Sequence, residues 1–248
     1  MNAVLRTEAL SKRYGDFQAL DGISLALPRG ARHALIGPNG AGKTTLINAL
    51  TGTVRPSAGE VYLGDERVTA LRPEHRVRRG LARTFQINNL FPELTVLESV
   101  LLAACQRTGA ALDAWRALEA RRTEIESARA ILRLLKLEGA EATRTRDLAY
   151  GEQRLLEIAL ALACRPRILL LDEPAAGVPR RESVALFEAI AGLPGDLTVL
   201  FIEHDMDLVF RFARRITVLV AGTVLTEGTP QEIATDARVK QVYLGRAA

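Results

Sequence analysis

The sequence contains few cysteines. Its two cysteines, Cys105 and Cys164, are far apart among 248 residues and form no C-x-x-C pair. A disulfide scaffold is therefore excluded, and we expect reduced, partly buried thiols in a cytosolic protein.

Long apolar runs are absent as well. No uninterrupted apolar stretch approaches the roughly 20 residues that a helix needs to cross a bilayer. Residues 1–8 lack the apolar segment of a signal peptide. We therefore expect that any role at a membrane depends on binding to a membrane partner.

Charge of one sign does not dominate. Hydrophobic residues make up 48% of the chain and charged residues 25%, and the net charge is +4. A basic balance can favour nucleic acid or a membrane surface. Here, however, arginines are interspersed with acids, as in residues 74–79, which favours a solvated face. We expect no nucleic-acid partner, and the length suffices for one or two domains.

Three stretches of the chain differ in pattern. Up to about residue 87, short apolar runs alternate with turns such as Gly15-Asp16, which predicts β-strands. From about 88 to 150, apolar residues recur at helical spacing. After Gly151, helical and strand-like segments alternate, which is typical of parallel βαβ units. The expected fold class is therefore α/β, with a β-rich start and an inserted helical subdomain.

A glycine-rich loop is the most informative motif. Residues 37–44 fit the pattern G-x-x-x-x-G-K-[ST], between an apolar strand-like stretch and a helix-like one. Backbone amides and the positive end of the helix would bind phosphates, while Lys43 would reach the β- and γ-phosphates and Thr44 would ligate Mg²⁺. A chance glycine-rich turn is the less favoured interpretation. The expected nucleotide-binding residues are Gly37, Pro38, Asn39, Gly40, Ala41, Gly42, Lys43 and Thr44.

Two carboxylates follow an apolar strand-like segment, residues 169–171. Because ligands gather at the carboxyl ends of parallel strands, Asp172 would hold Mg²⁺ opposite Thr44. Glu173 would lie next to the attacking water and is the candidate general base. The alternative is an acidic turn before Pro174.

Three further residues carry weaker signals. His204 follows another strand-like segment, so a γ-phosphate contact is favoured over a structural role. Gln86 follows Arg83-Thr84-Phe85 and, taken alone, is equally typical of a solvated loop. Gly151 opens a strongly helical run, whose free amides and dipole suit an anion, although an ordinary helix start has the same pattern.

Taken in order, these elements resemble the ATP-binding cassette ATPases over essentially the whole chain. The resemblance implies that the phosphate loop extends to Thr45, that Gln86 serves both catalysis and Mg²⁺ binding, and that Tyr14 stacks on adenine. It also implies a mixed-sheet core formed by residues 1–87 and 151–248, with a helical subdomain at 88–150, in a single cassette domain. The signature segment would bind the ATP of a second cassette through Ala149, Tyr150, Gly151 and Glu152.

The family also implies partners. Two cassettes would pack head to tail around Mg·ATP and drive a pair of transmembrane permease subunits. The helical insert and the loop after Gln86 would contact the permease, at the cytoplasmic face of the inner membrane. A periplasmic or lipid-anchored solute-binding protein would take part indirectly.

The residues within the motifs are similar to those of one branch of the family, the ATPases of branched-chain amino-acid importers. Characteristic segments are residues 83–86, 148–154, 172–177 and 202–206. Urea importers and lipopolysaccharide exporters use closely related subunits, so these stay as alternatives. A soluble repair or translation cassette is less expected, because the chain has one cassette and no long heptad run. The absence of N-K-x-D argues against a GTPase.

Two positions depart from the family pattern. Ala149 replaces the usual signature serine, which removes one hydroxyl worth about 1 kcal/mol as a neutral hydrogen bond. Pro179 occupies a position where the family commonly has Asp, and proline offers neither a side-chain acceptor nor an N–H. Pairing with a different cassette would supply the standard residue, so we expect a heterodimer rather than a homodimer.

Overall fold

A computed structural model describes residues 3–84, 90–108 and 118–244 of the chain. These residues form two compact units. The first unit comprises Met1–Arg83, Arg167–Glu173 and Pro194–Ala248, and the second comprises Thr84–Pro166 and Pro174–Leu193.

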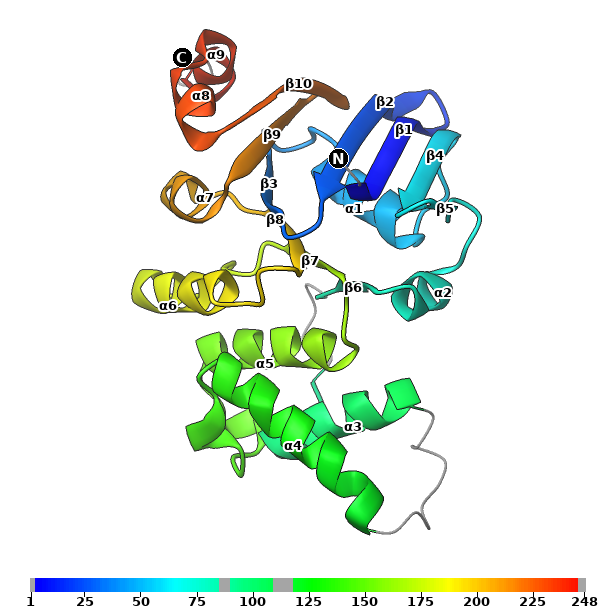
Figure 1. The fold of residues 1–248 in the computed structure, drawn as a ribbon. Coiled ribbons are helices and arrows are strands. Elements are labelled where there is room, and N and C mark those ends of the chain that lie inside the picture. Colours follow the sequence, from blue (N-terminus) through cyan, green and yellow to red (C-terminus); the bar gives the residue numbers. More distant parts are fainter. Residues whose placement is uncertain (1–2, 85–89, 109–117, 245–248) are drawn as a thin grey trace. The chain divides into compact units, whose positions relative to one another are not determined.

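The first unit contains a six-stranded sheet in the order β10-β9-β3-β8-β7-β6 (Figure 1). All neighbours are parallel except the β9–β10 hairpin. Every residue of β3, β7 and β8 is buried, as expected for central strands covered on both faces. The strands are β3 (Arg32–Ile36), β6 (Leu81–Arg83), β7 (Ile168–Asp172), β8 (Thr198–Ile202), β9 (Arg215–Val220) and β10 (Thr223–Gly228).

The pairing register brings the carboxyl ends of three strands to one edge. Leu35 of β3 lies opposite Ile202 of β8, and Asp172 of β7 also lies opposite Ile202. The residues that follow these strands, which include Gly37, Glu173 and His204, are therefore gathered at the same edge.

A second, antiparallel sheet has the order β2-β1-β4-β5. Its long hairpin turns at Gly15 (φ 58°), so that Tyr14 pairs with Phe17. Apolar side chains of this sheet share a core with the helix that follows β3, which joins both sheets through buried leucines and isoleucines. The strands are β1 (Ala3–Tyr14), β2 (Phe17–Pro28), β4 (Ala58–Leu63) and β5 (Glu66–Arg67).

The helix that follows β3 is α1 (Lys43–Thr51), bounded by Gly42 (φ 100°) and Gly52 (φ 82°). A Cβ on Gly42 would lie 2.6 Å from the carbonyl oxygen of Ala19, so both backbone angle and space require glycine. The other helices of this unit are α2 (Pro73–Arg78), α7 (Met206–Phe212), α8 (Pro230–Thr235) and α9 (Ala237–Leu244).

The second unit is helical among its described residues. It contains α3 (Val96–Thr108), α4 (Leu118–Leu134), α5 (Tyr150–Ala163) and α6 (Arg180–Ala191), with short 3-10 turns at Glu138–Ala140 and Thr145–Asp147. The buried face of α4 and of the residue that follows it is formed by Ala128, Leu132 and Leu135, whose i, i+4, i+7 spacing follows the helical period.

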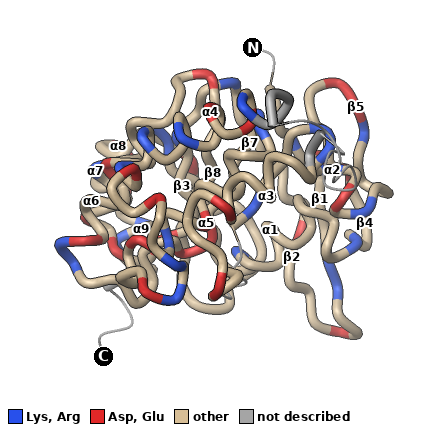
Figure 2. The backbone as a smooth tube through the Cα atoms, turned by 90° about the horizontal axis from the view of Figure 1, so that it is seen from below, with Lys and Arg blue, Asp and Glu red and all other residues tan. Residues whose placement is uncertain are grey.

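The predicted α/β class is confirmed, with its antiparallel amino-terminal sheet and its helical part. Basic and acidic residues are both scattered over the chain trace (Figure 2). Among the described residues, no helix is long and apolar enough to cross a membrane.

Candidate functional site

The loop between β3 and α1 is wrapped around a buried lysine. Lys43 is 7% exposed, and its Nζ donates to the carbonyl oxygens of Gly37 (2.7 Å) and Pro38 (3.1 Å). Burial lowers the pKa of Lys43, while the nearby Glu173 and Asp172 carboxylates act in the opposite direction. The cation is thus held inside the loop, from where it can bind an anion that enters.

The loop has little room for side chains where it passes the sheet. Gly37 has φ 154°, and a Cβ there would lie 2.2 Å from the carbonyl oxygen of Leu219. The amides that follow lead into the start of α1, which has no acidic residue in its first turn. A helix start with free amides and no carboxylate of its own is a ready anion site.

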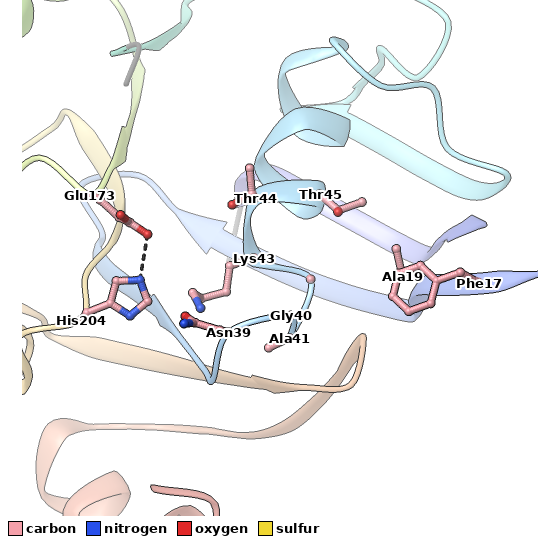
Figure 3. A pocket seen from close by; sticks show the side chains of 11 residues that line it. Phe17, Ala19, Asn39, Gly40, Ala41, Lys43, Thr44, Thr45, Glu173 and His204 are labelled. Carbon is pink, nitrogen blue, oxygen red and sulfur yellow. Dashed lines mark hydrogen bonds and ion pairs between the residues drawn. The ribbon is translucent and has the colours of Figure 1, made fainter. Parts of the chain in front are cut away.

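A pocket of about 350 Å³ lies over this loop, within the size range of small-ligand sites. Figure 3 shows Phe17 and Ala19 at one end and Glu173 and His204 at the other, with the loop between them. The pocket is lined by Phe17, Ala19, Asn39, Gly40, Ala41, Gly42, Lys43, Thr44, Thr45, Glu173 and His204.

Glu173 is held in an uncommon backbone conformation. Its φ is 51°, in the left-handed region that costs a residue with a side chain about 1–3 kcal/mol. Its amide donates to the carbonyl oxygen of Ile202 (3.1 Å), which fixes this geometry. The result is that its carboxylate faces the pocket and lies 2.7 Å from Nε2 of His204 (Figure 3). The carboxylate of Glu173, predicted as a general base, and the imidazole of His204, predicted as a γ-phosphate contact, therefore lie side by side.

Asp172 is buried beside this pair. Its side chain has no exposed area, and its Oδ2 accepts a hydrogen bond of 2.7 Å from the Arg83 guanidinium. Its Oδ1 is buried and has no hydrogen-bond partner. An orphaned buried carboxylate oxygen fits a ligand or water of a hard cation such as Mg²⁺. The donor set of hydroxyl, carboxylate and phosphate suits this metal.

The pocket contains an aromatic residue that the sequence reasoning missed. We expected Tyr14 to meet the adenine, but the residue that lines the pocket is Phe17, which is 63% exposed. Tyr14, its partner across the turn, lies with its ring 4.9 Å from Nζ of Lys12. The sequence shows only an aromatic residue directly after the predicted turn at Gly15-Asp16, because the exposure of the ring is not visible there. Stacking by Tyr14 stays a prediction.

The signature segment belongs to the second unit. Ala149 precedes α5 and offers no side-chain cap, while its amide donates to the Glu152 carboxylate (3.0 Å). The Tyr150 hydroxyl donates to the carbonyl oxygen of Ala176 (3.2 Å). Gly151 packs against Glu182, whose Oε2 would be 2.6 Å from a Cβ at that position. Gln86 lies outside the described residues.

These features define a nucleotide-binding protein of the phosphate-loop class. A family described as "ABC transporter" matches residues 20–176, and one described as "Branched-chain amino acid ATP-binding cassette transporter" matches residues 223–248. The chain belongs to the ABC transporter family of ATP-binding cassettes.

Curated relatives match over nearly the whole length. The high-affinity branched-chain amino acid transport ATP-binding protein LivG of Salmonella typhimurium is 41% identical, with 98% of both chains covered. The corresponding protein BraF of Pseudomonas aeruginosa is 39% identical over the same shares. A probable LivG of Methanocaldococcus jannaschii is 33% identical and covers 98% of this chain and 97% of its own.

Solved structures of ATP-binding cassettes are similar to this chain over nearly its whole length. MJ1267, an ATP-binding cassette of an ABC transporter, gives a TM-score of 0.85 at 32% identity, with 98% of this chain and 99% of that chain covered. Its ADP conformation gives 0.84 at 30% identity, with 99% and 100% covered. The predicted family and the predicted ATPase class are confirmed, and the family binds ATP or ADP.

Proposed function

We propose that this chain is the ATP-hydrolysing subunit of an importer of branched-chain amino acids. The observation that carries the substrate class is the match of residues 223–248 to the branched-chain cassette family, together with relatives of that name along the whole chain. The pocket around Lys43 supports ATP hydrolysis as the activity of this subunit.

The phosphates would lie over the loop amides. Lys43 already points its ammonium into the loop and would exchange its carbonyl contacts for the β- and γ-phosphate oxygens. The residues that would hold Mg²⁺ are Thr44 and Asp172, with Gln86 proposed as a third. When bound, the metal neutralises charge on the transferring phosphate.

Glu173 would act as general base. Its carboxylate, 27% exposed, is open to a water molecule and close to the phosphate end of the pocket. His204, whose Nε2 is 2.7 Å from Glu173, would orient that carboxylate and contact the γ-phosphate once ATP is bound. Hydrolysis would then join the water oxygen to the γ-phosphorus and break its bond to the bridging oxygen, so that ADP leaves while Glu173 takes one proton from the water.

Subunits of this family dimerise and work with membrane permeases. We propose that Ala149, Tyr150, Gly151 and Glu152 bind the ATP of a second cassette, and that this partner is a different chain because of Pro179. A solute-binding protein would deliver the amino acid to the permease. The complex would sit at the cytoplasmic face of the inner membrane.

Transport in vesicles tests the substrate class. The chain is purified with the permease that binds it and with the matching solute-binding protein, and uptake of labelled leucine is compared with uptake of labelled urea. We expect ATP-dependent uptake of leucine alone. Uptake of urea, or co-purification with a lipid-exporting permease, would contradict the proposal.

Mixed and single cassettes test the dimer. Vesicles that contain this chain as the only cassette should transport poorly, and addition of a second, different cassette should restore transport. Full coupled transport by the homodimer would overturn the heterodimer and leave the substrate class untouched.

A further inference from the structure

One arginine connects two elements of the metal half of the site. Arg83 is the last residue of β6, and its side chain is 12% exposed. One terminal nitrogen donates to Oδ2 of Asp172 at 2.7 Å, and the other donates to Oδ1 of Asn48 at 2.6 Å. The guanidinium thus joins β7 to α1.

The two partners of Arg83, Asn48 and Asp172, lie on elements that carry predicted Mg²⁺ ligands. Asn48 lies on α1 four residues after Thr44, so both are on the same face of that helix. Asp172 lies at the end of β7, and Arg83 is paired in register with Leu170, two residues earlier on that strand. Arg83 therefore connects the helix that carries Thr44 to the strand that carries Asp172.

The two oxygens of Asp172 are used unequally. Oδ2 is bound by Arg83, while Oδ1 is buried and without a partner. A guanidinium that binds one carboxylate oxygen orients the other one. Second-shell contacts of this kind orient metal-binding side chains.

We propose that Arg83 is a positioning residue for Mg²⁺, which orients Asp172 and locks it to α1 through Asn48. The inference rests on the proposed role of Asp172 at the metal. A simple counter-ion for a buried carboxylate would need the charge of Arg83 only, whereas positioning needs both arms of the fork. Lysine carries the charge but offers a single ammonium in place of the planar fork.

The experiment separates these roles with variants that keep the net charge. Arg83→Lys and Asn48→Ala are prepared in the full chain with Glu173→Gln, so that no ATP is consumed. Arg79→Lys is the matched control, because Arg79 pairs with Glu66 (2.8 Å) on the same unit away from the pocket. Binding of a fluorescent N-methylanthraniloyl ATP is titrated at increasing free Mg²⁺ and in EDTA.

We expect Arg83→Lys to raise the Mg²⁺ concentration for half-maximal enhancement of ATP binding by roughly tenfold. Asn48→Ala should raise it by a smaller factor, and a double variant should add little to Arg83→Lys because both act through one contact. Binding in EDTA should stay within about twofold for all variants, which also reports that the phosphate loop is folded. Arg79→Lys should match the parent protein.

Two results would overturn the proposal. One is a half-maximal Mg²⁺ concentration in Arg83→Lys that equals the parent value, which leaves only the counter-ion role. The other is a change of equal size in EDTA and in Mg²⁺, which indicates a general loss of structure. Asp172→Asn tests the underlying assignment: if this variant also keeps the Mg²⁺ dependence, Asp172 is not at the metal and the site proposal itself fails.

Discussion

The N-termini of α1 and α5 differ in the charged residues and hydrogen bonds at their first turns. At α1 the helix begins with Lys43, has no acid in its first turn, and follows a left-handed Gly42. At α5 it begins with Tyr150, and the Glu152 carboxylate already accepts the Ala149 amide. Both ends carry a positive dipole, but only the first combines it with a buried cation and a glycine-rich loop.

The surroundings of the two helix starts differ as well, and the start of α1 lies at a pocket of its own unit. The α1 end is completed by Lys43, Glu173 and His204, all of which line one pocket. The α5 end is instead tied to its own unit, through Tyr150 to Ala176 and through Gly151 to Glu182. The start of α5 is therefore packed against its own unit, and the Ala149 amide is already bound to the Glu152 carboxylate.

Replacing Glu173, the proposed general base, should separate the α1 site from α5 with the largest effect. Glu173→Gln keeps the shape of the side chain and removes its basicity, so hydrolysis should fall about 100- to 10,000-fold. ATP binding at α1 should persist, because the loop and Lys43 are intact. Phosphate release and equilibrium binding of ATP measure the two effects. Near-normal hydrolysis would remove Glu173 from its role.

Removing the buried cation should weaken binding at α1 next most. Lys43→Ala deletes an ammonium that would donate to phosphate, and hydrogen bonds to charged groups contribute about 1.5–3 kcal/mol. We expect roughly 10- to 100-fold weaker ATP binding, measured by calorimetry. A variant with unchanged affinity would mean that the loop amides alone hold the nucleotide.

The end of the α1 pocket that Phe17 lines allows a paired test. Phe17→Ala should weaken ATP binding about two- to tenfold, since an aromatic contact contributes about 0.5–1.5 kcal/mol. Tyr14→Ala is the comparison variant on the other side of the turn. The ring whose loss weakens adenosine binding more is the stacking residue. Equal affinities for both variants and the parent would exclude stacking by either ring.

The smallest change is expected at α5. Ala149→Ser adds a hydroxyl that can accept an amide of the first turn, and such a cap stabilises by about 0.5–2 kcal/mol relative to alanine. Thermal unfolding should shift upward by about 2–4 °C per kcal/mol for a chain of this size. Ala149→Gly is the control, because it removes the methyl group without adding an acceptor. An unchanged midpoint for serine would mean that Glu152 already satisfies this helix start.

Much of the α1 site could be predicted from sequence, because its motifs are local. Each motif can be recognised within a few residues of sequence: the glycine spacing before Lys43, and the two acids after an apolar strand. Parallel pairing then makes the position of His204 foreseeable, since it follows a neighbouring strand. Phe17 was missed because exposure of a ring is not visible in the hairpin pattern.

By itself, the sequence determined the α/β class, the phosphate loop and the order of its candidate catalytic residues, because backbone conformation and charge at these positions depend on neighbours in the chain. Only the tertiary structure decided that Arg83 bridges Asn48 and Asp172, that Phe17 rather than Tyr14 lines the pocket, and that Glu173 meets His204 at 2.7 Å. These contacts join residues 31 or more positions apart in most cases, and they arise from strand register and packing. No local pattern encodes such distances.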